Sequence, residues 1–306
     1  MAPRWPSHYV TVPITQRPDQ PIDTIMSLRG KLKFAEITDT GKVREHNEDA
    51  IGSDIDYGLM VLADGMGGYN AGEVASGIAV QTISELATEG ADREHRHEID
   101  PATGLMRQTI VLRDAVTRAN KIIFQTAQSQ THCEGMGTTL VAAMFYDNKV
   151  SMAHVGDSRA YRLRGTKFEQ LTLDHSLLQE LVDRGFYSEE EAQRSTNRNY
   201  VTRALGVEPT VEVEVQEFDV LPDDVFLLCS DGLPDMVEDE DIHLTISTFN
   251  ASLDVVGQQL VKLSNEHGGR DNVSVMLAQV LDTFAAKRSL LFHIANLFRS
   301  LIGAGR

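Results

Sequence analysis

Four aspartates stand at the ends of apolar segments that are far apart in the sequence. They are Asp64 after residues 58–63, Asp157 two residues after 150–155, Asp231 two residues after 225–229, and Asp271 just before 273–277. Each apolar run is typical of a buried strand, so each carboxylate should lie at the end of a strand. A single Asp beside glycine is most often a turn residue. Four of them suggest convergence on one acidic, oxygen-rich site.

The early polar segment 41–49 adds further candidate ligands. Glu48 and Asp49 lie there, with Arg44 just upstream. Carboxylates and carbonyl oxygens suit Mg²⁺ and Mn²⁺, whereas zinc requires histidine and cysteine, for which we find no close spacing. Two cations would offset the mutual repulsion of the acids and lower the pKa of a bound water. The Arg44 guanidinium could hold phosphate oxygens. The alternative is a surface of unrelated acids with a solvated arginine.

Composition excludes several classes of protein. The chain has 306 residues, of which 42% are hydrophobic, and a net charge of −17. Such an acidic body repels the phosphates of nucleic acids. No apolar run is long enough for a transmembrane helix or resembles a secretory signal. Cys133 and Cys229 show no pairing signature, which favours a reducing cytoplasm. Neither has the arginine spacing of a cysteine-dependent phosphatase, and Cys229 fits a core position.

The chain divides into three parts. Residues 1–30 contain five prolines and no apolar period, which indicates a disordered leader. Residues 31–282 show no linker and no repeat, so we expect one domain. Residues 283–306 predict an amphipathic helix flanked by basic residues. That helix could dock on the domain, which we favour slightly, or bind a partner or a membrane surface.

Within the domain, apolar patterning predicts strands and helices that do not alternate regularly. The strands are expected at 31–38, 50–54, 58–63, 138–145, 150–155, 160–163, 211–218, 225–229 and 273–280. The helices are expected at 72–88, 105–128, 177–184, 188–194, 239–249 and 253–267. This order favours an α+β fold of packed antiparallel sheets flanked by helices over a βαβ alternation.

A series of motifs resembles a known enzyme family. In order they are Arg44 with Asn47-Glu48-Asp49, then 64–68 (DGMGG), 135–139 (GMGTT), 155–161 (VGDSRAY), 171–176 (LTLDHS), 202–206 (TRALG), 230–233 (SDGL) and 269–274 (GRDNVS). Together they are similar to the bacterial form of the metal-dependent type 2C (PPM) protein serine/threonine phosphatases. The resemblance covers residues 34–281 approximately. No single motif is specific, but the whole set in this order is.

The resemblance implies a four-layer α-β-β-α sandwich with a dinuclear Mn²⁺ or Mg²⁺ centre at one end. By position, Asp64 would bridge the metals, and the Gly65 carbonyl would be a ligand of one of them. Asp231 and Asp271 would bind the other. Glu48 and Asp49 would serve the first metal directly or through water. Arg44 would hold the substrate phosphate, and Asp157 with Asp231 would form a third, weaker metal site.

The family chemistry is in-line attack by metal-activated water on phosphoserine or phosphothreonine. Animal members place a histidine after the Asp-Gly pair, where this chain has Met66, so the general acid is not assigned. His46 or a water on the metal are the candidates. Residues 184–192 resemble the mobile flap beside the active site, though a plain surface helix pair fits as well.

We therefore expect an enzyme that opposes a bacterial serine/threonine kinase, acts on phosphoproteins, does not bind nucleic acid and is a cytoplasmic monomer. A regulatory phosphatase for one dedicated partner remains open, although no sensor domain is attached. A non-catalytic phosphoprotein-binding or partner-switching module on the same fold is the other alternative. The intact set of Asp64, Asp231 and Asp271 argues against that last reading.

Overall fold

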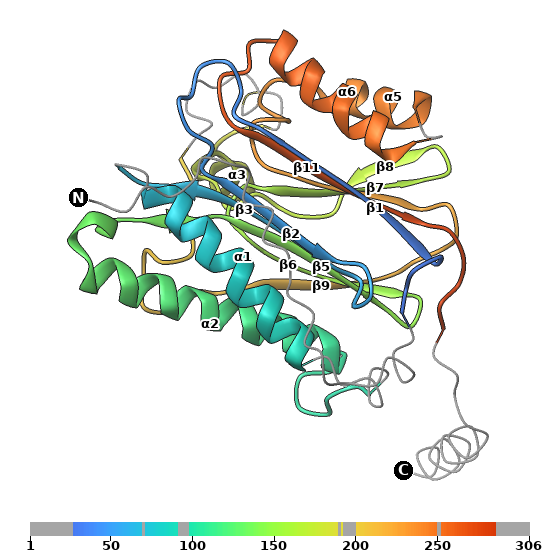
Figure 1. Ribbon diagram of the computed structural model, residues 1–306, viewed down its shortest axis with the longest axis horizontal. Helices are drawn as coiled ribbons and strands as arrows, with labels where there is room; N and C mark the ends of the chain where they lie inside the picture. The colour runs from blue at the N-terminus through green and yellow to red at the C-terminus, as the bar shows by residue number, and fades with distance from the viewer. Residues whose placement is uncertain are drawn as a thin grey trace, which may run out of the picture.

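The computed structural model describes residues 27–68, 71–90, 98–188, 191, 200–249 and 252–285. It confirms the expected α+β sandwich: two antiparallel sheets lie face to face, with helices covering the outer face of each (Figure 1). Most of the predicted leader, helix 188–194 and C-terminal helix lies outside the described residues. Those three predictions stay untested.

The first sheet has the strand order β2-β3-β5-β6-β9, with β4 paired to β3. Its strands are β2 (Asp49–Asp54), β3 (Leu59–Met66), β4 (Gly137–Thr138), β5 (Leu140–Tyr146), β6 (Lys149–Val155) and β9 (Glu214–Asp219). The second sheet has the order β1-β11-β10-β7-β8. Its strands are β1 (Leu32–Asp39), β7 (Arg159–Arg164), β8 (Lys167–Gln170), β10 (Val225–Cys229) and β11 (Val273–Val280).

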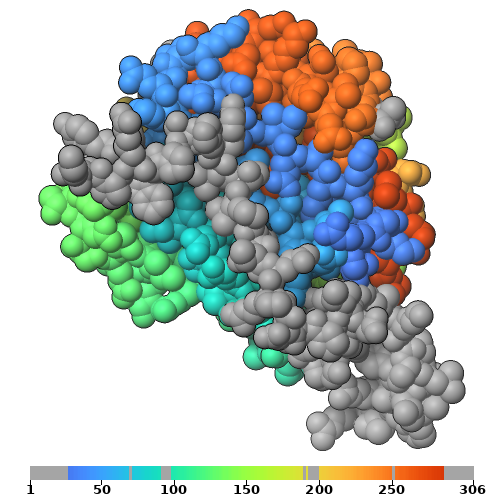
Figure 2. Space-filling model, viewed as in Figure 1, coloured from blue at the N-terminus to red at the C-terminus, as the bar shows by residue number. Residues whose placement is uncertain are grey.

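Two helices cover each sheet. The long helices α1 (Ala71–Gly90) and α2 (Arg107–Ser129) pack on the first sheet, and α5 (Asp239–Thr248) and α6 (Leu253–Glu266) pack on the second (Figure 1). The short helices α3 (Leu177–Asp183) and η2 (Thr131–Cys133) lie in connections. In Figure 2 the blue surface of β1 meets the orange surface of α6, where Ile37 packs beside Gly257. No helix in the described ranges is long and apolar enough to cross a membrane.

The central layer of the core lies between the sheets. Phe145 of β5 meets Phe226 of β10 edge to face, with ring centroids 5.3 Å apart. Met60 and Met276 are fully buried in the same cluster. Because helices also bury the outer faces, the central strands are apolar on both sides, which explains the continuous apolar runs in the sequence. The packing holds the ends of the strands in fixed positions.

Two strands were not expected from the sequence. One is β8, whose residues Lys167–Gln170 are exposed or half-buried and carry two charges. It forms the edge of the second sheet by pairing with β7. The other is the separate two-residue β4, because the strand expected at 138–145 is divided: Thr138 pairs with Gly65, and β5 begins at Leu140. Such short or polar strands arise from tertiary pairing and carry little periodic signal of their own.

Candidate metal centre

Strand register in the first sheet brings two of the expected acids together. Asp49 begins β2 and pairs directly with Asp64 near the end of β3. The strands β3 and β6 are both antiparallel to β5, so their C-terminal ends lie at the same end of the sheet. Asp157 follows the C-terminus of β6 and therefore lies at the same end of the sheet as Asp64.

The second sheet supplies the other two acids. Its strands β10 and β11 are antiparallel neighbours, with Cys229 opposite Val275. Asp231 follows the end of β10 and Asp271 precedes the start of β11. Because the two strands are antiparallel, both acids lie at the same end of the pair. The Ser230 amide donates to the Ser274 carbonyl at 3.1 Å, which continues the pairing into this end.

Asp49 joins the two sheets at this end. Its Oδ2 atom accepts hydrogen bonds from the Ser230 hydroxyl at 2.8 Å and the Ser274 hydroxyl at 2.6 Å. Asp64 is fixed through its main chain: its carbonyl accepts from the Thr138 hydroxyl at 2.8 Å, and its amide donates to the Thr139 hydroxyl. Hydrogen bonds thus fix the side chain of Asp49 and the main chain of Asp64.

The carboxylates interact strongly. Burial, followed by the charges of Asp49, Asp231, Asp157 and Asp271, raises the pKa of Asp64 well above its ordinary value. The pKa of Asp231 is likewise raised, by burial first and then by Asp157 and other acids. Burial also raises the pKa values of Asp49 and Asp157 to about 6. The structure therefore confirms that the strand-end acids meet in one cluster.

Two oxygens in this cluster have no partner among the described residues. The Oδ1 atoms of Asp49 and Asp231 are buried and accept no hydrogen bond from the part of the chain that the structure describes. A buried polar atom without a partner is costly. Carboxylate oxygens are the ligands that Mg²⁺ and Mn²⁺ prefer. The residues present therefore fit a centre for hard divalent cations.

Arg44 lies at the mouth of the cluster. Its Nη2 atom donates to Asp271 Oδ2 at 2.6 Å, and half of its side chain is exposed. Burial opposes its charge, but Asp271, Asp231 and Asp64 outweigh that effect and raise the pKa of Arg44. Among the described residues the guanidinium has no other hydrogen-bond partner, so its remaining N–H groups can donate to an anionic ligand.

Glu48 and Gly65 lie where the backbones of three elements meet. The Gly65 amide donates to the Glu48 carbonyl at 3.1 Å, and the Glu48 amide donates to Asn272 Oδ1 at 2.8 Å. A Cβ on Gly65 would lie 2.2 Å from the Gly72 carbonyl oxygen, so only glycine fits there. The Glu48 carboxylate lies against Gly72 in the first turn of α1, where the helix dipole favours a negative charge. Burial raises the pKa of Glu48.

The structure adds one acid that the sequence reading missed. Asp235 contributes to the raised pKa values of both Asp157 and Asp231, and its amide donates to the Asp231 carbonyl at 2.9 Å. Its position four residues after Asp231, in the same turn, was the available signal. His46, in contrast, has an exposed side chain, and its carbonyl accepts from Asn272.

Comparison with known proteins agrees with this geometry. Residues 41–278 match the family model described as protein phosphatase 2C. The serine/threonine phosphatase stp of Listeria monocytogenes is 39% identical over 248 residues, which are 79% of this chain and 93% of that protein. The serine/threonine protein phosphatase PstP of Mycobacterium tuberculosis is 36% identical over 255 residues, which are 82% of this chain and 45% of that protein.

Solved structures show the same fold. The crystal structure of PstP from M. tuberculosis superposes with a TM-score of 0.72 at 35% identity, covering 82% of this chain and 99% of that one. The PstP catalytic domain in complex with two manganese ions gives a TM-score of 0.71, with 82% of this chain and 99% of that one covered at 35% identity. The chain has buried carboxylates at one end of the sandwich and is similar to these phosphatases over most of its length. It belongs to the metal-dependent protein phosphatase 2C family of serine/threonine phosphatases.

Proposed function

We propose that the carboxylate cluster holds the two Mn²⁺ or Mg²⁺ ions with which this phosphatase hydrolyses phosphoserine and phosphothreonine in proteins. The observation that carries the assignment is the pair of buried, unpartnered Oδ1 atoms of Asp49 and Asp231 within a cluster of mutually repelling acids. Asp64 would be shared by both ions, because the charges of acids from both sheets raise its pKa and it therefore lies close to both groups. Asp231 and Asp271 would hold one ion from the second sheet.

The other ion would be served from the first sheet. Asp49, Glu48 and the Gly65 carbonyl are adjacent there, through the Asp49–Asp64 register and the Gly65–Glu48 hydrogen bond. When bound, the two ions supply activation of the attacking water and neutralisation of phosphate charge. Asp157 would join Asp231 in a third, weaker site, since its charge is the largest electrostatic contribution to the raised Asp231 pKa.

Arg44 would bind the substrate phosphate. Its contact with Asp271 holds the guanidinium beside the cluster, and half of its side chain is exposed, so a phosphoprotein could reach it. A planar, permanently charged group suits two phosphate oxygens at once. Met66 cannot donate a proton to the leaving serine oxygen, and the exposed His46 is a weak candidate for that role. We propose that a water molecule gives this proton to the leaving oxygen.

The partners follow from the chemistry. Phosphoproteins are the substrates, and a serine/threonine kinase must supply them, so we place the enzyme opposite such a kinase. The two free, buried cysteines suit a reducing cytoplasm. We propose a monomeric enzyme whose C-terminal segment, apolar on one side in sequence, contacts its own domain, a partner or a membrane surface. No observation favours the non-catalytic alternative.

The direct test is hydrolysis of a phosphothreonine peptide by the purified full chain with Mn²⁺, with EDTA, and with Asp231→Asn in Mn²⁺. Activity should require the metal and should fall by orders of magnitude in the variant. Asp219→Asn is the matched control, since Asp219 is exposed and pairs with Lys149 at 2.6 Å. Folded protein that is inactive in every sample would refute the proposal, as would an Asp231→Asn enzyme that keeps full activity.

A further inference from the structure

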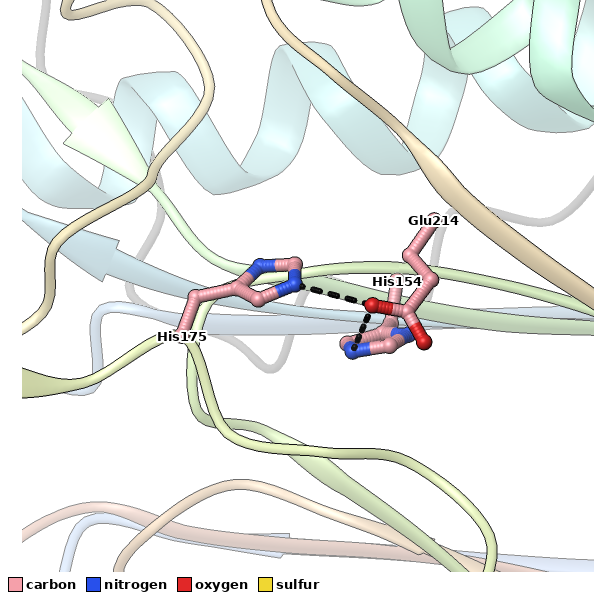
Figure 3. Close-up of side chains that lie close together, drawn as sticks. All are labelled: His154, His175 and Glu214. Carbon is pink, nitrogen blue, oxygen red and sulfur yellow. Dashed lines mark hydrogen bonds and ion pairs between the residues drawn. The ribbon is translucent and has the colours of Figure 1, made fainter. Parts of the chain in front are cut away.

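A second polar cluster, formed by His154, His175 and Glu214, lies beside the Asp157 turn. Figure 3 shows one carboxylate oxygen of Glu214 facing a nitrogen of each imidazole ring. This Oε2 atom is 3.3 Å from His175 Nε2 and 3.9 Å from His154 Nε2. The rings stack with centroids 4.7 Å apart, and both histidines are buried. The sequence reading did not detect this group, because its members come from three separate segments.

The spacing alone would suit a zinc ion. The three ligand atoms lie within 4.8 Å of one another, and adjacent ligands of tetrahedral zinc are about 3.4 Å apart. The hydrogen bonds argue against it. His154 Nε2 is 2.9 Å from the Leu173 carbonyl, which can only accept, so this nitrogen carries a proton. The Arg203 guanidinium also lies 3.3 Å from His175 Nε2, where it would repel a cation.

The tautomer of His175 follows from its other nitrogen. The Gly156 amide donates to His175 Nδ1 at 3.1 Å, so Nδ1 carries the lone pair and Nε2 carries the proton, which faces Glu214 and leaves no acceptor on this ring for Arg203. Burial lowers the pKa of both histidines, which keeps the rings neutral. The His175 ring is therefore a neutral donor and acceptor, whose Nδ1 lone pair is used by the Gly156 amide and whose Nε2 faces Glu214.

His175 forms two hydrogen bonds with Gly156. Besides the contact with the ring, the His175 amide donates to the Gly156 carbonyl at 2.9 Å. Gly156 has φ +109, and a Cβ there would lie 2.7 Å from Thr139 Cβ, so the turn is tightly confined. Because Asp157 is the next residue, the orientation of the Gly156 peptide sets the direction in which the Asp157 carboxylate enters the acidic cluster.

His175 also contacts the chain that follows residues 184–192, the segment expected to form the flap. The Thr202 amide donates to the His175 carbonyl at 2.8 Å, and Ser176 forms a bridge with Val201. Ser176 caps α3, the helix that leads into the flap, by accepting from the Gln179 amide. His175 thus connects the chain on both sides of this segment, at α3 and at Val201 and Thr202, with the turn that carries Asp157.

We propose that His175 is a positioning residue for the Asp157 metal site, with Glu214 fixing the ring tautomer that accepts from the Gly156 amide. The inference rests on the proposed role of Asp157 as a metal ligand. It predicts that loss of the ring acceptor weakens metal binding at Asp157, so that hydrolysis needs more Mn²⁺ while its rate at saturating Mn²⁺ is kept.

The test uses His175→Leu, which removes the acceptor, and His175→Asn, whose Oδ1 can replace Nδ1. In His175→Leu, the Mn²⁺ concentration for half-maximal hydrolysis should rise about tenfold, while kcat at saturating Mn²⁺ stays within about twofold. The Mn²⁺-induced rise in Tm should shrink in parallel. His175→Asn should restore most of both. Adding His175→Leu to Asp157→Asn should produce no further change in Mn²⁺ dependence, since both act on one site.

Nuclear magnetic resonance supplies a readout independent of activity. The ¹⁵N shifts of wild-type His175 should show a proton on Nε2, and Glu214→Ala should redistribute it while Glu214→Gln largely keeps it. Exchange of the Gly156 amide should accelerate in His175→Leu. A lower Tm with unchanged Mn²⁺ dependence and unchanged Gly156 exchange would make His175 merely structural and overturn the inference. Stoichiometric Zn²⁺ binding that is lost in His154→Leu would overturn the hydrogen-bond assignment.

The wild-type enzyme separates this inference from the proposed function. If wild-type hydrolysis does not need metal, the proposed function fails. If wild-type hydrolysis needs Mn²⁺ and His175→Leu titrates identically, only the positioning role fails.

Discussion

Replacement of Asp49 by Asn should stabilise the metal-free protein. Burial raises the pKa of the Asp49 carboxyl from its ordinary value of 3.8 to about 6. At about 1.4 kcal/mol per pKa unit, keeping this group charged above pH 6 costs the folded state ~3 kcal/mol. Asn carries no charge, and its carbonyl oxygen can still accept from Ser230 and Ser274. For a domain of this size the gain corresponds to a Tm rise of about 6–12 °C.

The gain should depend on pH in a defined direction. A carboxyl whose pKa is raised binds its proton more tightly in the folded protein than in the unfolded chain. The stability of wild type in EDTA should therefore fall, relative to Asp49→Asn, as the pH rises from 3.8 to about 6. The variant should lead at pH 7.5 and should lose most of its lead at pH 4.5.

The assay is thermal unfolding in EDTA at both pH values, repeated at pH 7.5 with Mn²⁺. Mn²⁺ should stabilise wild type more than the variant, because the variant has lost a ligand charge. Asp219→Asn serves as control and should not gain stability, since pairing with Lys149 lowers the pKa of Asp219. An Asp49→Asn protein that is less stable than wild type in EDTA at pH 7.5 would refute the electrostatic reasoning.

Three further substitutions probe other parts of the structure. Arg44→Ala should raise KM for a phosphopeptide about tenfold through loss of charge-assisted hydrogen bonds, with the Mn²⁺-induced Tm shift kept; a change in that shift alone would mean that Arg44 serves the metals through Asp271. Gly65→Ala should lower Tm by several degrees and reduce activity, because its Cβ would lie 2.2 Å from the Gly72 carbonyl oxygen; unchanged unfolding would contradict this packing. Phe145→Ala should cost about 3–5 kcal/mol in urea unfolding, and a loss below 1 kcal/mol would show that the sheets close over the cavity.

Much of the fold follows from the sequence because the central strands are buried on both faces. Runs such as 59–63 and 225–229 need no partner to be recognised as strands. The polar edge strand β8 could not be recognised in this way, because its residues acquire strand geometry only by pairing with β7. The acids at strand ends could be singled out one by one. Their mutual approach depends on the register of Asp49 with Asp64 and on the stacking of the two sheets.

The histidine cluster marks the opposite case. His154 lies within the apolar strand β6, His175 lies in the 171–176 motif, and Glu214 begins the edge strand β9. The sequence around each residue therefore does not indicate that the three side chains meet. Their contact results from three loops and strands meeting in space. Asp235 lies between these extremes, since only its spacing from Asp231 in one turn pointed to it.

The proposed metal ligands are divided between the two sheets, so the core between the sheets should help to set the geometry of the metal site. Asp49 and Asp64 belong to one sheet, whereas Asp231 and Asp271 belong to the other. The distance between the two halves is therefore determined by the thickness of the layer in which Phe145 meets Phe226. Larger or smaller side chains in that layer, far from any ligand, should widen or narrow the gap between the metal-binding halves. Substitutions in this apolar layer should therefore alter the metal preference of the enzyme without changing any carboxylate.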